Sequence, residues 1–514
     1  MTKGYTMSGN DVYDLCVLGC GPAGFAGAMR ALDFGKHVCI VEGAEIGGAG
    51  IMWGALASKT MWELAKDYAV AAKQDRGYQA SGLTVDYCAV RRTVLQAAKE
   101  KQYQMLSQIE TYSPRRWKGP GALTLKHGWG RFLSKTAVEI RSDDGKKEVI
   151  KARYFLIATG SRPRNFPHVL MDQCRVLNSD GILNLQRFPE RMVIIGAGVI
   201  GCEYATIFSS FGQTKVYLVD RANRVIPYED EDISTFVSDN LVRSGVQVIH
   251  SAQLREIIPR TEYQQVVLDF QDGHSEVIES DAVFISIGRT FERSGLGLEV
   301  LGLDTGSPGI LKTDANCCVS DNIYAAGDLT HHPALVNIAE MEGRYAVKHM
   351  FGKNRWPLNY DNMSTVMFFY PAVAAIGLNE KGCRSRKIPY RAAYLSNVLC
   401  NRAIAMRATH GFVKILVTDD EQQRILGMRA AGPQVSSTIM SIAHFMDHGK
   451  GVLDVLKSVY PHPTITEGIE ECLRMLLGKS IFKPHAFPDL LRLWRWHPET
   501  GVTVEERGDG NGQP

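Results

Sequence analysis

Near its start the chain reads Leu15-Cys-Val-Leu-Gly19-Cys-Gly21-Pro-Ala-Gly24, an apolar run leading into a Gly-x-Gly-x-x-Gly turn. A segment rich in small residues follows, and then a second apolar run that ends in Glu42, 23 residues after Gly19. We expect Gly19 to allow a tight turn, Gly21 to let backbone N–H groups approach a pyrophosphate, and Gly24 to let a helix pack closely. Glu42 stands where a carboxylate accepts hydrogen bonds from a ribose. The segment therefore predicts a dinucleotide-binding βαβ unit.

The same pattern returns at Met192-Val-Ile-Ile-Gly196-Ala-Gly198-Val-Ile-Gly201-Cys-Glu203. Its second apolar run ends in Asp220, 24 residues after Gly196. One dinucleotide needs only one such loop, so two intact copies favour two different dinucleotides. The alternative is a duplicated fold in which one copy no longer binds.

Asp220 also predicts which nicotinamide nucleotide the second unit prefers. A carboxylate about 4 Å from the 2′-phosphate of NADP would cost roughly 1–4 kcal/mol. Arg221 and Arg224 follow directly and could reduce this preference. NAD is therefore favoured over NADP.

The composition is that of a globular protein with two to four domains: 514 residues, 45% hydrophobic, 22% charged, with a formal charge of +3. So small a charge does not favour nucleic acid or an anionic membrane as a partner. The first residues lack the apolar core of a secretion signal, and no run reaches the roughly 18–20 apolar residues of a membrane span. The eleven cysteines show no zinc-ligand spacing. We expect a cytoplasmic protein with reduced thiols, no metal site and no stable membrane insertion.

Five further segments occur in a fixed order along the chain. They are Phe155-Leu-Ile-Ala-Thr159-Gly160, Val283-Phe-Ile-Ser-Ile-Gly288-Arg289, Asn322-Ile-Tyr-Ala-Ala-Gly327-Asp328, Gly411-Phe-Val-Lys-Ile-Leu-Val with Arg424-Ile-Leu-Gly427, and His462-Pro463-Thr464-Ile-Thr-Glu467. With the two loops, they make residues 11–479 resemble the pyridine nucleotide–disulfide oxidoreductase family. The resemblance is to its dihydrolipoamide dehydrogenase and soluble transhydrogenase branches.

The resemblance implies an α/β fold with two Rossmann-like domains, for FAD and NAD, and a C-terminal α+β dimerisation domain. The implied boundaries are 1–165 and 290–363 for the FAD domain, 166–289 for the NAD domain, 364–482 for dimerisation and 483–514 for a tail. A homodimer is implied as well. The FAD-binding residues it implies are Gly19, Gly21, Gly24, Glu42, Gly48, Lys59, Gly130, Thr159, Gly160 and Asp328. Those for NAD are Gly196, Gly198, Gly201, Glu203, Asp220 and Gly288.

Two of these residues are predicted to act together in catalysis. The resemblance pairs Lys59 with Glu203 beside the flavin N5 atom. A cation at that place would stabilise the negative charge of a reduced flavin.

The chain departs from the family at two positions that matter for chemistry. Disulfide-using relatives read GGTCxxxGCxPSK in this segment, and the two cysteines are replaced here by Gly50 and Ala55. Neither residue can form a thiolate or a mixed disulfide. Cys16 with Cys20, or Cys317 with Cys318, are poor substitutes, because the first pair faces the core or the pyrophosphate and the second is strained.

His462 and Glu467 match the family's histidine–glutamate pair, which exchanges protons with thiols across the dimer interface. Imidazole titrates near neutral pH and a carboxylate fixes its tautomer. With no thiol to serve, His462 either protonates a bound acceptor or belongs to an inherited structural hydrogen bond. Both alternatives stay open.

The tail contains Leu490, Leu491, Leu493, Trp494 and Trp496, which could pack onto the protein or the other subunit, or touch a membrane surface. It is too short to anchor the chain in a membrane by itself, and its last seven residues are expected to be disordered.

These patterns predict an FAD enzyme that takes hydride from NADH and passes electrons directly to a non-disulfide acceptor. A quinone-type oxidant or a second nicotinamide nucleotide would fit. The alternatives are dihydrolipoyl dehydrogenase activity and a non-catalytic FAD-binding scaffold.

Overall fold

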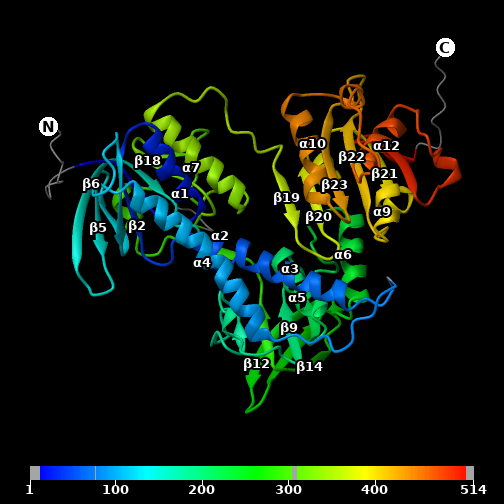
Figure 1. Cartoon of the computed structure of the whole chain (residues 1–514), viewed down its shortest axis with the longest axis horizontal. Helices are drawn as coiled ribbons and strands as arrows, with labels where there is room; N and C mark the ends of the chain where they lie inside the picture. Colours follow the sequence, from blue (N-terminus) through cyan, green and yellow to red (C-terminus); the bar gives the residue numbers. More distant parts are fainter. Residues whose placement is uncertain (1–11, 76, 304–308, 505–514) are drawn as a thin grey trace. The chain divides into compact units, whose positions relative to one another are not determined.

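Strand β1 (Tyr13–Leu18) is the apolar run that precedes the first glycine turn, and it pairs in parallel with β2 (His37–Glu42) and β6 (Lys147–Ile157). The computed structural model describes residues 12–75, 77–303 and 309–504 (Figure 1). They fall into two units. Unit 1 holds the described residues among Met1–Leu64, Gly82–Arg187 and Ile287–Leu358, and unit 2 holds those among Ala65–Ser81, Phe188–Ser286 and Asn359–Pro514. The predicted domain boundaries stay a prediction.

Unit 1 is built on a parallel sheet with the strand order β18-β6-β1-β2-β3, extended by β17 at one edge. Strands β4 and β5 form an antiparallel meander with β6. The remaining strands of the unit are β3 (Ala122–His127), β4 (Trp129–Ser134), β5 (Ala137–Arg141), β7 (Ser161–Pro163), β8 (Val176–Leu177), β16 (Arg289–Phe291), β17 (Cys318–Ser320) and β18 (Ile323–Ala325).

Both faces of β1 are buried, as expected for a central parallel strand. Leu15 and Val17 share one core cluster with helices α1 (Pro22–Asp33) and α7 (Val336–Phe351), which lie side by side in Figure 1. Cys16 and Leu18 face a second cluster, formed with the meander strands. Alternation along one strand thus places helices on one face and the meander on the other.

Three more helices begin in unit 1: α2 (Gly48–Ile51), α3 (Ala55–Ala71) and α4 (Tyr87–Thr111). The start of α4 is set by Asp86, whose side chain accepts hydrogen bonds from the backbone N–H groups of Cys88 and Ala89.

Unit 2 repeats the parallel arrangement with neighbouring strands in the order β11-β10-β9-β15. The apolar run before the second glycine turn forms β9, and the run ending next to Asp220 forms β10. The elements of this part are β9 (Arg191–Ile195), α5 (Val199–Ser210), β10 (Lys215–Val219), α6 (Glu231–Arg243), β11 (Gln247–Ile249) and β15 (Ala282–Ile285), with an antiparallel sheet of β12 (Ala252–Pro259), β13 (Gln264–Phe270) and β14 (Ser275–Ser280).

A third sheet of unit 2 is also antiparallel, with the order β19-β20-β23-β22-β21-β24-β25. Helices α10 and α12 share one core cluster with this sheet. The elements are β19 (Ser364–Met367), β20 (Val373–Gly377), α8 (Glu380–Ser385), β21 (Tyr390–Ser396), α9 (Asn401–Ala405), β22 (Phe412–Thr418), β23 (Ile425–Ala431), α10 (Val435–Asp447), α11 (Val452–Val455), α12 (Glu467–Leu476), β24 (Leu491–His497) and β25 (Gly501–Val504).

A buried ionic cluster joins β22 to α6 and α8. The ammonium of Lys414, with no exposed side-chain surface, lies 2.7 Å from Asp230, 2.7 Å from Asp232 and 3.0 Å from Glu380. Burial alone would lower the pKa of Lys414, but the three carboxylates raise it. Burial raises the pKa of Asp232, whereas Lys414 outweighs burial and lowers the pKa of Asp230 and Glu380. The charges stay buried because they compensate one another.

The C-terminal segment packs as a β-hairpin and does not stand away from the protein. Strand β24 pairs with β21, and β25 pairs with β24. Leu491 and Leu493 enter the core, and the indole N–H of Trp494 donates to Glu380 at 3.2 Å. The packing alternative therefore holds for this hairpin, while the seven residues predicted to be disordered lie outside the described residues.

Candidate functional site

In the first glycine turn, neighbouring backbone atoms leave no room for a side chain at two of the three glycines. Gly19 has a φ of +98°, and a Cβ there would lie 2.4 Å from the carbonyl oxygen of Ala158. A Cβ on Gly24 would lie 1.9 Å from the oxygen of Gly19. Around Gly21, by contrast, a Cβ would meet nothing within 4 Å. The middle glycine thus opens space at the start of α1, where N–H groups and the helix dipole attract a phosphate.

Glu42 is held at the carboxyl end of β2 by two backbone donors. Its Oε2 accepts from the N–H of Cys20 at 2.6 Å, and its Oε1 accepts from Ala44 at 2.8 Å. One bond therefore reaches into the glycine turn itself. These two bonds fix the orientation of the carboxylate, and the ribose contact of Glu42 stays a prediction.

The segment around α2 rests on this same turn. The N–H of Gly47 donates to the oxygen of Cys20 at 2.9 Å, and a Cβ on Gly48 would lie 3.3 Å from the Cα of Gly21. Lys59 lies one turn into α3, where its ammonium donates to the hydroxyl of Ser58 at 3.3 Å.

Gly50, in α2, is enclosed by the neighbouring helices. A Cβ there would lie 2.6 Å from the Cγ of Pro22 and 3.3 Å from a methyl group of Val336. Pro22 begins α1 and Val336 begins α7, so two helix starts close this position.

Asp328 is part of a hydrogen-bonded set that the sequence did not predict. The hydroxyl of Ser161 donates to Asp328 at 2.5 Å, and the guanidinium of Arg289 donates to that hydroxyl at 2.7 Å. Thr159 donates to the oxygen of Glu292 at 2.6 Å. Ser161 and Arg289 directly follow the predicted residues Gly160 and Gly288. This adjacency is the one feature of the sequence that could have indicated them.

Three further glycines have different surroundings. Gly160 and Gly288 adopt φ values of +70° and +102°, and a Cβ on either would meet nothing within 4 Å. A Cβ on Gly130 would lie 2.8 Å from a methyl group of Leu18, so this glycine brings β4 close to the end of β1.

The second glycine turn repeats the geometry of the first in unit 2. Gly196 has a φ of +106°, and a Cβ there would lie 2.5 Å from the oxygen of Ser286. A Cβ on Gly201 would lie 1.9 Å from the oxygen of Gly196, while one on Gly198 would meet nothing within 4 Å. Asp220 accepts from the N–H of Ala197 at 2.5 Å, as Glu42 accepts from Cys20.

The two arginines after Asp220 are not equivalent. Asp220 also accepts from the N–H of Ala222 at 2.8 Å. The guanidinium of Arg224 donates to the carbonyl oxygens of Pro227 and Glu229, both at 3.0 Å. Arg224 is therefore occupied by the backbone, and only Arg221 of the two is exposed.

Glu203 lies on α5 with 4% of its surface exposed, and its carboxylate accepts from the N–H of Phe368 at 2.9 Å. Lys59 belongs to unit 1 and Glu203 to unit 2. Their pairing stays a prediction.

His462 and Glu467 are brought together, with 2.7 Å between the Nδ1 of the imidazole and Oε1 of the carboxylate. The second carboxylate oxygen accepts from the N–H of Thr464 at 2.8 Å. The His462 side chain is 62% exposed. The pair is thus an oriented imidazole on the surface of unit 2.

Cys16, Cys20, Cys39 and Cys202 are free, buried thiols. Cys16 and Cys39, on the neighbouring strands β1 and β2, pair in register. Burial raises the pKa of Cys16 and raises that of Cys39 to about 12. Burial also raises the pKa of Cys20 and Cys202. A thiol with a raised pKa is a poor nucleophile near neutral pH.

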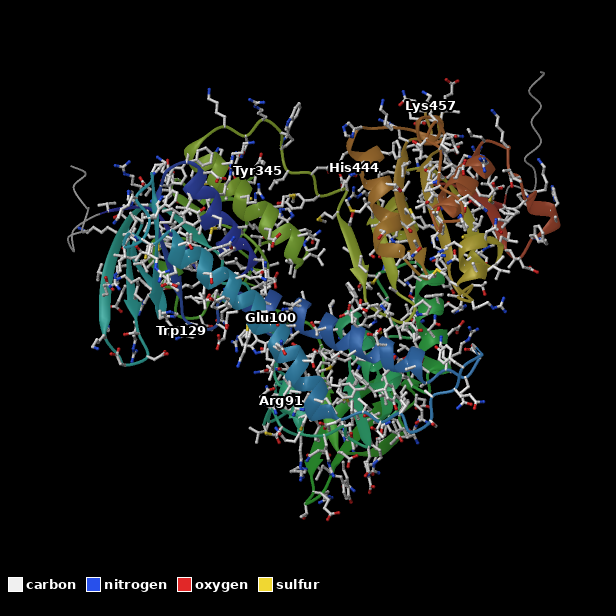
Figure 2. The ribbon with its side chains drawn as sticks, viewed as in Figure 1. Arg91, Glu100, Trp129, Tyr345, His444 and Lys457 are labelled. Atoms are coloured by element: carbon white, nitrogen blue, oxygen red, sulfur yellow. The ribbon has the colours of Figure 1, made fainter. Side chains whose placement is uncertain are left out.

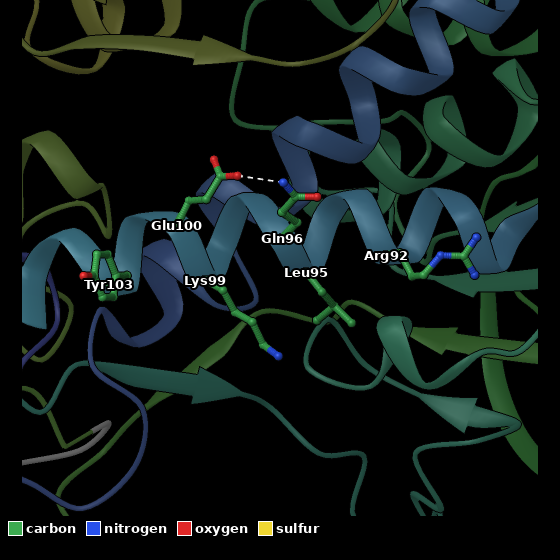
Figure 3. A pocket seen from close by; sticks show the side chains of 6 residues that line it. All are labelled: Arg92, Leu95, Gln96, Lys99, Glu100 and Tyr103. Atoms are coloured by element: carbon green, nitrogen blue, oxygen red, sulfur yellow. Dashed lines mark hydrogen bonds between the residues drawn. The ribbon is translucent and has the colours of Figure 1, made fainter.

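One surface pocket lies along the exposed side of α4 (Figure 3) and includes the hydrogen bond from Gln96 to Glu100, 2.9 Å long. It is lined by Arg92, Leu95, Gln96, Lys99, Glu100 and Tyr103. None of these is a predicted site residue.

The described part of the chain contains neither a cluster of metal ligands nor a helix that could span a membrane. No group of three or more His, Cys, Asp or Glu side chains there could hold a metal ion. No helix within that part is long and apolar enough to cross a membrane.

Known proteins resemble this chain over most of its length. The dihydrolipoyl dehydrogenase of Chlamydia muridarum is 29% identical over 482 residues, which cover 92% of this chain and 99% of that protein. A dihydrolipoyl dehydrogenase of Bacillus subtilis is 29% identical over 471 residues, covering 91% and 97%.

Solved structures share the fold at lower identity. LpdA from Mycobacterium tuberculosis matches with a TM-score of 0.82 and 24% identity, covering 90% of this chain and 100% of that one. The HOCl-induced flavoprotein disulfide reductase RclA of Escherichia coli matches with a TM-score of 0.78 and 22% identity, covering 90% and 100%.

The family model described as pyridine nucleotide-disulphide oxidoreductase matches residues 13–343, and its dimerisation domain matches residues 363–473. The predicted fold class is confirmed: Rossmann-like α/β domains of the FAD and NAD type, followed by a dimerisation domain. The family implies binding of FAD and NAD(P). The chain therefore belongs to the pyridine nucleotide-disulphide oxidoreductase family.

Proposed function

We propose that this protein is a homodimeric, FAD-dependent NADH oxidoreductase that passes electrons to an acceptor other than a disulfide. A bound flavin supplies the chemistry of accepting hydride from a nicotinamide and releasing electrons to a second substrate. A quinone-type oxidant or a second nicotinamide nucleotide is the proposed acceptor. The residues of the chain bind, orient and support these groups.

The proposed cofactor sites rest on the open space in the two glycine turns. At Gly21 and Gly198 a Cβ would meet nothing within 4 Å, although the flanking glycines are tightly enclosed. The first turn is hydrogen-bonded to Glu42 and the second to Asp220, and each carboxylate is proposed to accept hydrogen bonds from a ribose. We assign FAD to the first turn and NADH to the second, with Asp328 on the ribityl or phosphate side of the flavin.

A preference for NAD is supported by the surroundings of Asp220. Its carboxylate is held by two backbone donors and would oppose a 2′-phosphate at that place. Arg224, which could have offset this charge, is bonded to carbonyl oxygens.

Lys59 is proposed to place its ammonium beside the flavin N5 atom, with Glu203 as its partner. The cation would stabilise the charge that develops on reduction. Lys59 follows the α2 segment, which itself rests on the first glycine turn.

The proposed absence of a redox disulfide rests mainly on Gly50 and Ala55, which occupy the two cysteine positions of disulfide-using relatives. The enclosed position of Gly50 leaves little room for a side chain. Cys16 on β1 and Cys39 on β2, which pair in register, are buried thiols with raised pKa values. Electrons would then leave the flavin directly.

Anaerobic titration of the purified protein with NADH, followed by absorbance, tests this proposal. We expect two electrons per subunit to bleach the flavin completely, with no thiolate–flavin charge-transfer band on the way. A requirement for four electrons would reveal a redox disulfide and overturn the proposal.

Dihydrolipoyl dehydrogenase activity is the second candidate. The short contact between His462 and Glu467 favours it, and so do the curated relatives, several of which are named dihydrolipoyl dehydrogenase. Substantial turnover of dihydrolipoamide by the purified protein would establish this candidate. A non-catalytic FAD-binding scaffold, in contrast, would carry flavin that NADH does not reduce.

A further inference from the structure

One end of unit 1 brings together segments of the chain that carry exposed cations. These segments are the turn after α1 (residues 34–36), the loop between α4 and β3 (residues 112–121) and the chain after α7 (residues 352–356). A Cβ on Gly35 would lie 3.2 Å from the Cβ of Pro120, and one on Gly352 would lie 2.9 Å from the ring of Phe34. The segments therefore form one continuous surface, at the end where α1 and α7 finish (Figure 1).

Aromatic rings hold two of the cations in place on this surface. The ring centroids of Phe34 and Phe351 are 6.4 Å apart. The guanidinium of Arg30 lies 4.8 Å from the centre of the Phe34 ring, and the ammonium of Lys36 lies 5.0 Å from that of Phe351. A cation–π contact holds a cation without cancelling its charge. Positive charge is thus fixed at this end of the unit.

The cations here outnumber the acids beside them. Asp33 pairs with Arg30 at 2.6 Å, and Glu110 pairs with Arg116 at 2.5 Å. The other cations of the surface form no ion pair within the described part of the chain, and they are Lys36, Arg115, Lys118, Lys353 and Arg355. The formal charge of +3 for the whole chain hides this local excess, because acids elsewhere offset it.

Trp356 and Trp117 lie among these cations. Trp356 follows Arg355 directly and is 79% exposed. Trp117, between Arg116 and Lys118, is 36% exposed, and its indole N–H donates to the oxygen of Pro120 at 3.3 Å. An indole open to water forgoes a large hydrophobic gain, and tryptophan is enriched where its ring can meet lipid on one side and water on the other.

We propose that this surface, named here the basic surface, docks the protein onto a membrane rich in anionic lipids, with Trp356 entering the lipid–water interface. The unpaired cations would lie next to lipid phosphates. The contact is peripheral, since no helix in the described part of the chain could span a membrane. Nucleic acid fits less well, because the cations come from several separate segments spread over a broad face, which suits a plane of headgroups better than one phosphate backbone.

The basic surface lies away from the proposed cofactor edge of unit 1. Lys36 directly precedes β2, and the loop of residues 112–121 directly precedes β3, so this surface is at the amino ends of the strands. The first glycine turn and Glu42 are at their carboxyl ends. Docking therefore leaves the glycine turn open, and the proposal goes beyond the proposed function and does not depend on it.

Flotation of the full-length protein with lipid vesicles tests the proposal. We expect the native chain to bind vesicles of equal parts phosphatidylcholine and phosphatidylglycerol, to ignore pure phosphatidylcholine, and to be released by high salt. Lys353→Ala/Arg355→Ala should lower the partition coefficient about 25-fold, since each cation near an anionic surface contributes about fivefold. Trp356→Ala should lower it about tenfold, and Trp356→Phe much less.

Lys146→Ala/Lys147→Ala is the matched control, because it removes the same number of cations from another surface of unit 1, where the two side chains are 85% and 59% exposed. It should bind vesicles as the native chain does. Equal unfolding midpoints in all variants would report that the fold is intact.

Native-like vesicle binding by Lys353→Ala/Arg355→Ala would overturn the proposal, and so would equal binding of the native chain to both kinds of vesicle. Tighter binding to single-stranded DNA than to the anionic vesicles would assign the basic surface to nucleic acid instead. None of these results bears on the flavin chemistry, so the proposed function would stand or fall separately.

Discussion

Gly50 lies between the first residues of two helices, and this crowding opposes a larger side chain at that position. We expect Gly50→Cys/Ala55→Cys to lower the unfolding midpoint and to gain no dihydrolipoamide turnover. The new Cβ at position 50 would lie 2.6 Å from the ring of Pro22, and overpacking of this kind costs about 1–3 kcal/mol. Thermal unfolding and a dihydrolipoamide assay measure the two effects.

Ala55→Cys alone serves as the control, because Ala55 already carries a Cβ, and it should unfold as the native protein does. A double variant of native stability that took up four electrons per subunit would contradict this prediction.

Asp220 is the residue through which the chain is expected to distinguish NADH from NADPH. We expect Asp220→Ser to reduce the ratio of kcat/KM for NADH over NADPH by about tenfold or more, because the charge opposing a 2′-phosphate is removed. Steady-state kinetics with both nucleotides measure the ratio.

Asp272→Asn is the comparison for this change, since Asp272 is an exposed acid of the same unit, at 69%, paired with His274. It should leave the ratio unchanged. An equal NADH-to-NADPH ratio of kcat/KM for the native protein and Asp220→Ser would show that the 2′ position of the nucleotide does not lie beside Asp220.

At the scale of the elements, β22 carries Lys414, whose buried charge is compensated by acids next to it. We expect Lys414→Met to lower the denaturation midpoint strongly, since breaking a buried ion pair costs about 3–5 kcal/mol. The loss should be larger at pH 8 than at pH 5. Without the ammonium, the carboxylates of Asp230 and Glu380 would lose the interaction that lowers their pKa values, so they would bind protons in the folded state at low pH. Urea titrations at both pH values test this.

Lys457→Ala removes an ion pair with Asp454 in which the lysine is 76% exposed, and it should shift neither midpoint (Figure 2). A loss that is the same at both pH values would show that the cluster does not take up protons as expected.

The hairpin of β24 and β25 is expected to be part of the fold and not an appendage. Removing residues 488–514 should lower the unfolding midpoint, because Leu491 and Leu493 are 2% and 6% exposed and each contributes roughly 1.5–3 kcal/mol on burial. A chain ending at Val504 keeps the hairpin and should unfold as the full chain does. Equal midpoints for all three would show that the hairpin adds no stability.

At the scale of the whole molecule, the exposed imidazole of His462 is the feature that favours a second subunit. Glu467 holds it at 2.7 Å although the imidazole side chain is 62% exposed, an arrangement suited to a group contributed across a dimer interface. We expect a particle mass of twice 56.9 kDa in solution. We also expect His462→Gln to slow acceptor reduction about 10²- to 10⁴-fold, the usual contribution of a proton donor.

Rapid mixing with NADH should show flavin reduction at the native rate in the same variant, which separates proton delivery from hydride uptake. Light scattering should give it the native mass. Native rates of acceptor reduction would assign the histidine a structural role.

Much of the fold followed from the sequence because a glycine turn is a local object. Gly24 is required by the backbone oxygen of Gly19, five residues earlier, and the acids at 42 and 220 lie one short helix and one strand after their turns. Such spacing is set by the local sequence and does not depend on the rest of the molecule. The parallel sheets, the two turns and their acids were therefore predictable.

Other features depend on segments that the sequence keeps far apart. Val336 closes the space at Gly50, and Trp129 reaches Gly43, across long stretches of chain. Lys414 finds its acids on two other elements, and β24 finds its place beside β21. No local pattern encodes these contacts, because they arise only when separate elements pack. The sequence alone thus determined the two glycine turns and the acids bonded to them, while tertiary packing decided what surrounds them.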